Sequence, residues 1–261
     1  MIALDQFDSL HAVAGLLVGI LVGLTGVGGG SLMTPLLVLM FGVSPHTAVG
    51  TDLLFAASTK VAGSAVHGWR QTIDWKIMRR LASGSIPAAL ASLVVLSWFG
   101  KVGKSTEHLM LVVLGTMLLL TAFAVLFQRK LLAFAMRYRD GKPRDAAVAT
   151  VLLGAALGVA VSISSIGAGA IGVTVLLMLY PELPVSRIVG TDIIHAVPLA
   201  LVAGIGHWLI GDVDLTLLVN LLVGSIPGVI LGSLFSSRAP DAWLRPALAA
   251  VLMVSGGRLL L

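Results

Sequence analysis

Residues 26–67 read GVGGGSLMTPLLVLMFGVSPHTAVGTDLLFAASTKVAGSAVH, and they place a glycine cluster and several ionisable side chains within apolar sequence. The pattern returns later in the chain, where residues 166–207 read IGAGAIGVTVLLMLYPELPVSRIVGTDIIHAVPLALVAGIGH. One fixed register aligns the two copies and matches the Gly-Thr-Asp triplets that end at Asp52 and Asp192. A repeat of this kind is typical of transporters whose binding site lies where the two repeats meet.

The composition indicates an integral membrane protein. Of the 261 residues, 57% are hydrophobic and 11% are charged, against about 45–50% and about 25% in soluble domains. We expect an all-α membrane fold, because the sequence lacks the short alternating segments of a β-barrel. The chain has no cysteine, which excludes disulfides and cysteine-held metal clusters, and we expect no cofactor. We interpret the net charge of +5 as a signal of membrane topology, and we expect no nucleic-acid partner.

Eight apolar segments follow one another in two sets of four. They cover residues 10–41, 47–67, 77–99, 107–127, 146–180, 186–210, 215–235 and 243–261. Six have about the 17–25 residues that one membrane span requires. The first segment of each set is longer and is interrupted by glycines. We therefore expect each repeat to contain one broken or re-entrant helix followed by three transmembrane helices.

The basic residues indicate how the two sets are oriented. If each long segment returns to the side from which it entered, the repeats are inverted and most Lys and Arg residues fall on one side of the membrane. If both long segments cross fully, the repeats are parallel and the bias is weaker. We expect two inverted repeats, residues 1–127 and 146–261, joined by a basic cytoplasmic connector at 128–145. We interpret the connector as a loop or interfacial helix that sets the orientation of the protein in the membrane. The alternative is that it binds lipid headgroups or a partner.

The glycines of the two interruptions indicate helix breaks, because each glycine costs up to about 1 kcal/mol relative to alanine inside a helix. A break at membrane depth frees backbone N–H groups, and the N-terminus of the following half-helix attracts anions. The alternative is that these glycines only allow helices to pack closely.

Ionisable side chains within the spans indicate a functional pathway, because burying them in lipid is costly. Asp52, Lys60 and His67 fall on one face of a helix at roughly 100° per residue. The second copy adds Asp192, His195 and His207.

Most of these ionisable residues are also consistent with a purely structural role. Each Asp closely follows a loop and is a candidate helix cap. His67 and His207 lie near segment ends, so they could instead lie at the membrane–water interface. Lys60 has Ala200 at the equivalent position of the second copy, so packing explains it poorly. We expect Lys60 to face a polar cavity, where it pairs with Asp52 or attracts an anion.

The doubled motifs resemble those of the TauE/SafE family of membrane permeases, which are sulfite exporters by name. The motifs are GVGGG followed by Pro35, AVGTDLL at Ala48, IDW at Ile73 and GSIPAAL at Gly84. The resemblance extends from Leu16 to the end of the chain. It implies export of sulfite or a related small organosulfonate anion across the bacterial inner membrane, driven by a proton or ion gradient.

A small oxyanion needs several hydrogen-bond donors and a compensating charge in a low-dielectric site. The residues that we expect to bind it are Gly28, Gly29, Gly30, Ser31, Thr51, Lys60, Ser165, Gly167, Gly169 and Thr191. The residues that we expect to carry a coupled proton are Asp52, His67, Asp192, His195 and His207. Ala168 stands where the first copy has a glycine, so we expect the two half-sites to contribute unequally.

Two further functions would use similar residues. Two membrane aspartates suggest an intramembrane aspartyl protease, although the VGTD context lacks the Gly-x-Gly-Asp form that such enzymes resemble. A divalent-metal permease would use His and Asp ligands, but the sequence has no close His-x-x-x-His or carboxylate cluster. We therefore expect a transporter and not an enzyme, with a small anion and the lipid bilayer as partners and no metal site. Glycine-rich helix faces permit a homodimer.

Overall fold

The computed structural model describes residues 8–25, 30–67, 73–99, 103–137, 146–235 and 241–261. Within these residues the protein is all-α, as the sequence predicts, and forms ten helices. The first half contains α1 (Ser9–Thr25), α2 (Gly30–Leu39), α3 (Pro45–His67), α4 (Trp75–Phe99) and α5 (Gly103–Arg137). The second half contains α6 (Ala147–Ser164), α7 (Ala170–Leu179), α8 (Val185–Ile210), α9 (Leu215–Phe235) and α10 (Asp241–Leu260).

Five helices among the described residues are long and apolar enough to cross a membrane: α4, α5, α6, α8 and α9. Helices α1 and α7 are apolar but shorter. Large apolar side chains cover the outside of the bundle, and Trp98, Val148 and Leu209 are each more than two-thirds exposed. So large an apolar exterior is expected of a surface that faces lipid, and the protein is therefore a multi-pass membrane protein.

The second copy contains a helix break where its glycines predict one. The turn between α6 and α7 holds Ser165, Gly167 and Gly169 at positive φ angles of 58°, 128° and 115°. Residues with a Cβ rarely adopt the last two conformations, so this turn requires its glycines. In the first copy α1 and α2 flank the equivalent position, and the predicted break at residues 26–29 lies outside the described residues.

Glycines also bring two pairs of helices into close contact. On α9, Gly224 meets the backbone of Ala12 and Gly232 meets that of Ile20, so α1 and α9 run parallel. Helices α4 and α6, their equivalents in the repeat, pack in the same way through Gly84. Close helix packing therefore explains many of the glycines outside the breaks. These glycine faces are used within the chain, and a homodimer stays a prediction.

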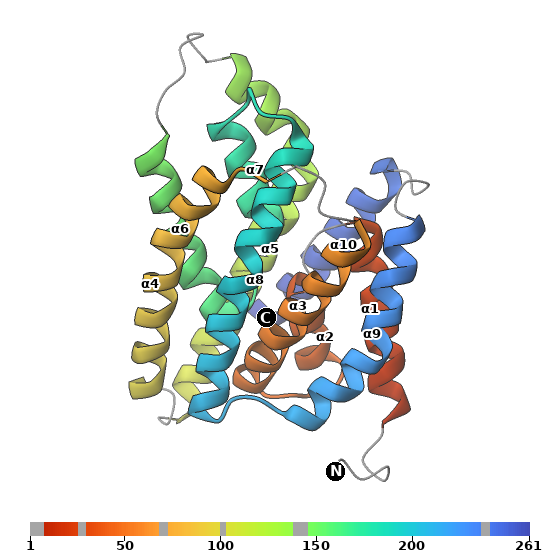
Figure 1. Cartoon of the computed structure of the whole chain (residues 1–261). Helices are drawn as coiled ribbons and strands as arrows, with labels where there is room; N and C mark the ends of the chain where they lie inside the picture. The colour runs from red at the N-terminus through yellow and green to blue at the C-terminus, as the bar shows by residue number, and fades with distance from the viewer. Residues whose placement is uncertain (1–7, 26–29, 68–72, 100–102, 138–145, 236–240) are drawn as a thin grey trace.

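Helices α3 and α8 occupy the middle of the bundle and run antiparallel. Gly50 on α3 lies against His207 on α8, and Gly204 on α8 lies against Leu54 on α3. Figure 1 shows α4 and α6 on one side of this central pair and α1 and α9 on the other. The central pair consists of the helices that carry the two Gly-Thr-Asp triplets.

Two equivalent hydrogen bonds connect the halves. The N–H of Asp214, just before α9, donates to Oγ1 of Thr51 on α3 at 3.1 Å. The N–H of Asp74, just before α4, donates to Oγ1 of Thr191 on α8 at 2.8 Å. Both the donors and the acceptors are counterparts in the register that aligns the two copies. Each half thus holds the start of a helix of the other half.

The bundle has two distinct ends. Helices α1 and α9 begin and α8 ends at one of them, which we call the N-terminal end (Figure 1, bottom). Helix α5 ends and α6 begins at the other, which we call the connector end. Helix α5 continues to Arg137 because residues 128–137 contain neither Gly nor Pro. The first part of the predicted connector is therefore helical, and residues 138–145 lie outside the described residues.

Candidate functional site

Asp52 lies on α3 beside the short helix α2. Its side chain is fully buried and accepts a hydrogen bond from the hydroxyl of Thr34 on α2. The hydroxyl of Ser165, in the turn between α6 and α7, lies near the carboxylate without forming a hydrogen bond to it. The interpretation of Asp52 as a helix cap is wrong, because α3 begins at Pro45 and Asp52 lies inside it.

Asp192 takes the equivalent position in the second half. Helix α8 begins at Val185, so Asp192 is not a cap either. Its carboxylate lies against Gly172 on α7, so closely that a Cβ at Gly172 would collide with Oδ1. The backbone N–H of Gly169, at the start of α7, faces the carboxylate without forming a direct hydrogen bond. Asp192 therefore lies near the N-terminal turn of a half-helix, where the helix dipole favours negative charge.

Lys60 is the cation that accompanies the two carboxylates. It lies on α3, is only 8% exposed, and interacts electrostatically with Asp192 and with Asp52. Within the part of the chain that the structure describes, neither carboxylate comes within the 4.0 Å of a direct ion pair with its ammonium group. The structure thus brings Asp192 of the second half near Asp52 and Lys60 of α3.

His195 adds an imidazole to this group. It lies on α8, one turn after Asp192, and its ring is fully buried. Its Nε2 lies 2.8 Å from Oγ of Ser85 on α4, and the ring interacts electrostatically with Lys60. We refer to Asp52, Lys60, Asp192 and His195 as the central cluster.

Several buried polar atoms in and beside the central cluster have no hydrogen-bond partner among the described residues. They are Oδ1 of Asp52, both carboxylate oxygens of Asp192, Nδ1 of His195 and Oγ of Ser165. Most buried polar atoms in proteins are bonded to protein or to ordered water, and an unsatisfied one costs about 1–3 kcal/mol. The central cluster is therefore where water, a proton or a polar ligand is expected to bind.

Thr51 and Thr191 lie outside the central cluster. Their hydroxyls accept the hydrogen bonds that connect the two halves, and the hydroxyl of Thr191 also donates to the carbonyl oxygen of Arg187 at 2.7 Å. Each threonine precedes a cluster aspartate by one residue, and a step of about 100° points it to another face of the helix.

The remaining predicted substrate-binding residues lie at the two breaks. Gly30 and Ser31 begin α2, and Gly167 lies in the turn between α6 and α7. Gly28 and Gly29 lie outside the described residues.

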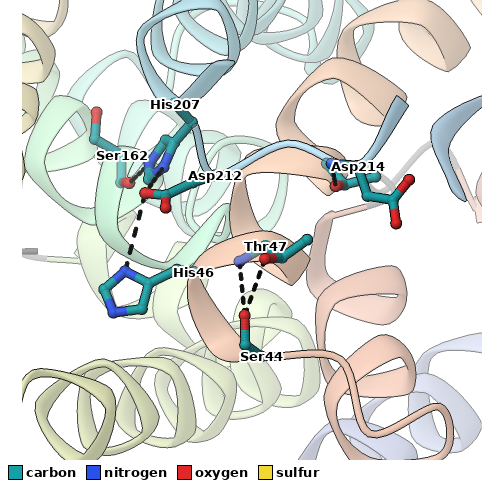
Figure 2. A network of polar contacts seen from close by, with 8 residues as sticks. Ser44, His46, Thr47, Ser162, His207, Asp212 and Asp214 are labelled. Atoms are coloured by element: carbon teal, nitrogen blue, oxygen red, sulfur yellow. Dashed lines mark hydrogen bonds and ion pairs between the residues drawn. The ribbon is translucent and has the colours of Figure 1, made fainter. Parts of the chain in front are cut away.

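His207 belongs to a second polar network, at the N-terminal end of the bundle (Figure 2). Its Nε2 lies 2.8 Å from the carbonyl oxygen of Ser162 on α6, and its Nδ1 lies 3.4 Å from Oδ2 of Asp212. The same carboxylate oxygen is 4.0 Å from Nδ1 of His46 on α3. The network joins the ends of α6 and α8 to the start of α3, so His207 is apart from the central cluster. The side chain of His67 lies outside the described residues.

A pocket of about 110 Å³ lies between the central cluster and the connector end. It is lined by Gly169, whose N–H faces Asp192, and by Arg245 on α10, which donates a hydrogen bond to Gln128 on α5. One water molecule needs roughly 10–15 Å³ of such volume. The pocket can therefore hold several waters or a small anion next to the break between α6 and α7.

Two site residues, Thr34 and Ser85, were not predicted from the sequence. Both carried a usable signal, because Thr174 and Ser225 are their counterparts in the second copy. Both are polar residues that recur within apolar segments of the two copies, which is the signal that could have identified them.

Metal coordination has no support in the described residues, since no group of three or more His, Asp and Glu side chains there could hold a metal ion. The sequence alternative of a divalent-metal permease therefore lacks a coordination site within this part of the chain.

Comparison with known proteins agrees with a transporter. Residues 11–259 match the family described as Sulfite exporter TauE/SafE. The chain is 41% identical over 251 residues to the probable membrane transporter protein YjnA of Bacillus subtilis (strain 168), covering 94% of this chain and 97% of that protein. It is 32% identical to the probable membrane transporter protein YdhB of the same organism, covering 91% and 96%. A probable membrane transporter protein of Xylella fastidiosa (strain 9a5c) is 27% identical, covering 86% and 83%. No solved structure gave a significant match.

The family match covers nearly the whole chain, and the two relatives from Bacillus subtilis align over most of both lengths. The family consists of transporters, so the alternative of an intramembrane protease is excluded. The protein therefore belongs to the TauE/SafE family of membrane transporters.

Proposed function

We propose that the protein is a secondary transporter that moves sulfite or a related small sulfur-containing anion across the bacterial cytoplasmic membrane. The observation that best supports this function is the burial of Lys60 near two carboxylates without a direct ion pair among the described residues. A buried charge normally has a partner in contact, because its desolvation is costly. Lys60 is therefore the residue that an anion would contact.

Further donors beside Lys60 suit an oxyanion. The hydroxyl of Ser165 has no hydrogen-bond partner among the described residues, and the N–H of Gly169 lies at the start of α7. Helix N-termini and hydroxyl groups bind the oxygens of sulfur and phosphorus oxyanions readily. A cation and several donors in a low-dielectric site supply the charge and hydrogen bonds that a small oxyanion loses on leaving water.

We further propose that the two halves are inverted repeats and that the connector end faces the cytoplasm. The antiparallel pairing of the equivalent helices α3 and α8 supports the inversion. The orientation is supported by the basic residues at the connector end, which include Lys76, Arg79, Arg80 and Arg187. The pocket lined by Arg245 then provides an entrance for anions from the cytoplasm.

Transport by the purified protein tests this function. Proteoliposomes would be assayed for uptake of labelled sulfite, with sulfate, thiosulfate and sulfoacetate as competitors. Loss of a hydrogen bond to a charged group costs about 1.5–3 kcal/mol, so we expect Lys60→Ala to slow sulfite transport roughly tenfold to a hundredfold.

The matched control is Lys76→Ala, which removes an exposed lysine at the start of α4. We expect this variant to transport sulfite at the wild-type rate. Undiminished transport by Lys60→Ala would contradict the proposed site, and absence of transport of every tested anion by the wild type would contradict the proposed function.

A further inference from the structure

The ionised groups of the central cluster do not balance. In their ionised forms Asp52 and Asp192 each carry one negative charge and Lys60 carries one positive charge. The polar groups that face the three ionisable side chains from neighbouring described elements are neutral. They are Thr34 on α2, Ser85 on α4, the hydroxyl of Ser165 and the N–H of Gly169 at the α6–α7 turn, and His195 in its uncharged form. Arg245 and Gln128 line the adjoining pocket. With both carboxylates ionised, the cluster has a net negative charge.

An anion that approaches Lys60 in this state meets two carboxylates already associated with the cation. Bringing another negative charge into a buried site that is already negative is strongly unfavourable. Protonation of the carboxylates removes this repulsion. It also turns each carboxyl group from an acceptor into a donor. The two oxygens of Asp192 have no donor in contact among the described residues, so a protonated Asp192 could donate to a bound oxyanion.

We propose that the substrate anion and protons bind to the central cluster together, with Asp52 and Asp192 taking up the protons. This proposal rests on the proposed anion transport. The protein is then a proton–anion cotransporter. Each proton comes from the solution on the side where the anion enters, forms an O–H bond on a carboxylate oxygen, and leaves to the solution on the side where the anion is released.

The geometry favours the aspartates over His195 as proton carriers. A second positive charge on His195 would lie beside Lys60, and the two buried cations would repel each other. The hydrogen bond between Nε2 of His195 and Ser85 is available to a neutral ring. His195 therefore acts as a neutral hydrogen-bonding group in the cluster.

The two carboxylates also lie toward opposite ends of the bundle. Asp52 is about two turns from the start of α3 at the N-terminal end, and Asp192 is about two turns from the start of α8 at the connector end. One proton-binding group is therefore nearer to each side of the membrane, as a carrier that loads on one side and unloads on the other requires.

Cotransport has a direct energetic consequence. If about one proton accompanies each negative charge of the anion, the cluster keeps the same net charge when loaded, which avoids the cost of burying a further charge. Transport is then electroneutral, so the membrane potential does not drive it. Export is driven by the outward gradient of the anion itself, against any inward proton gradient.

Proton uptake on anion binding tests this proposal without requiring a transport cycle. The purified protein in detergent would be titrated calorimetrically with isethionate, a sulfonate that stays a monoanion, and with sulfite. Each titration would be repeated in two buffers of different ionisation enthalpy, which gives the number of protons taken up per anion bound. We expect uptake of about one proton per isethionate in the wild type, and reciprocal linkage then requires anion affinity to fall as pH rises.

Variants identify the groups that take up the proton. We expect Asp52→Asn/Asp192→Asn to lose the proton uptake and Glu107→Gln, an exposed carboxylate on α5, to keep the wild-type number. Comparing variants with sulfite cancels the ionisation of sulfite itself. A melting curve of each variant establishes that it is folded.

The outcomes separate the two proposals. Anion binding with proton release, with no proton change, or with unchanged uptake in the double variant would overturn cotransport alone. A folded wild-type protein that binds neither anion would overturn the proposed function, and cotransport with it.

Discussion

At the residue scale, the carboxylate of Asp192 lies against the Cα of Gly172, with no room for a side chain between them. The close approach occurs on a carboxylate that also interacts with Lys60. A single methyl group at this position must therefore displace either Asp192 or α7.

We predict that Gly172→Ala slows sulfite transport roughly tenfold, which corresponds to about 1.4 kcal/mol, because the added Cβ displaces the Asp192 carboxylate. The matched control is Gly257→Ala on α10, where a Cβ meets nothing within 4 Å. We expect the control to transport normally and to melt at the same or a higher temperature, since alanine favours a helix by up to about 1 kcal/mol over glycine. Equal transport by the two variants would show that the Gly172 contact does not position Asp192.

The residues of the site could be predicted only in part. Asp52, Lys60 and Asp192 were identified because ionisable side chains are rare in apolar segments, and the structure brings them together. Helical periodicity already places Thr51 on another face than Asp52, but the sequence could not tell that this face meets the start of α9. Nor could it separate His195 from His207, since the carbonyl oxygen of Ser162 that binds His207 comes from another helix.

At the scale of elements, the hydrogen bonds from Asp214 to Thr51 and from Asp74 to Thr191 hold each half against the other. The bonds lie at opposite ends of the bundle, and they involve equivalent residues. Their contributions to stability are therefore expected to be similar and independent.

We predict that Thr51→Val and Thr191→Val each lower the free energy of unfolding by about 1 kcal/mol, because valine keeps the shape of threonine but leaves a backbone N–H without its acceptor. The double variant should lose the sum to within about 0.5 kcal/mol. Denaturation in detergent measures all three. Thr116→Val serves as control, since among the described residues the exposed hydroxyl of Thr116 bonds only to a carbonyl of its own helix, that of Val112. A loss at one threonine alone would argue against equivalent roles.

The elements themselves were largely predictable. Apolar length identified the long helices, and the strain that glycine relieves identified the break at Gly167 and Gly169. The partners of the helices were not predictable, because the glycines of α1 and α9 show that something packs closely against them without showing what. The sequence left a loop and an interfacial helix open for the connector, and composition alone could not show that α5 extends to Arg137.

At the scale of the whole molecule, inverted repeats require equivalent loops to face opposite sides of the membrane. The chain contains no cysteine, so a single introduced cysteine reports its own location. Ser44, just before α3, and Ser186, at the start of α8, are both exposed and differ from cysteine by one atom.

We predict that Ser44→Cys is labelled in intact cells by a membrane-impermeant maleimide, whereas Ser186→Cys is labelled only after the membrane is permeabilised. The reason is that Ser44 lies at the N-terminal end and Ser186 at the basic connector end, which the positive-inside rule assigns to the cytoplasm. Labelling of both from the same side would establish parallel repeats.

Lys60 corresponds to Ala200 in the second copy, so the two halves contribute unequally to the charge of the central cluster. Two copies of the first half, assembled as a dimer, would bring two lysines to two aspartates, and two copies of the second half would bring none. Only the fusion of two unlike halves supplies one cation for two carboxylates. Each half therefore depends on the other for the charge at the centre of the bundle. A symmetric dimer of either half alone could not carry the same charge at its centre.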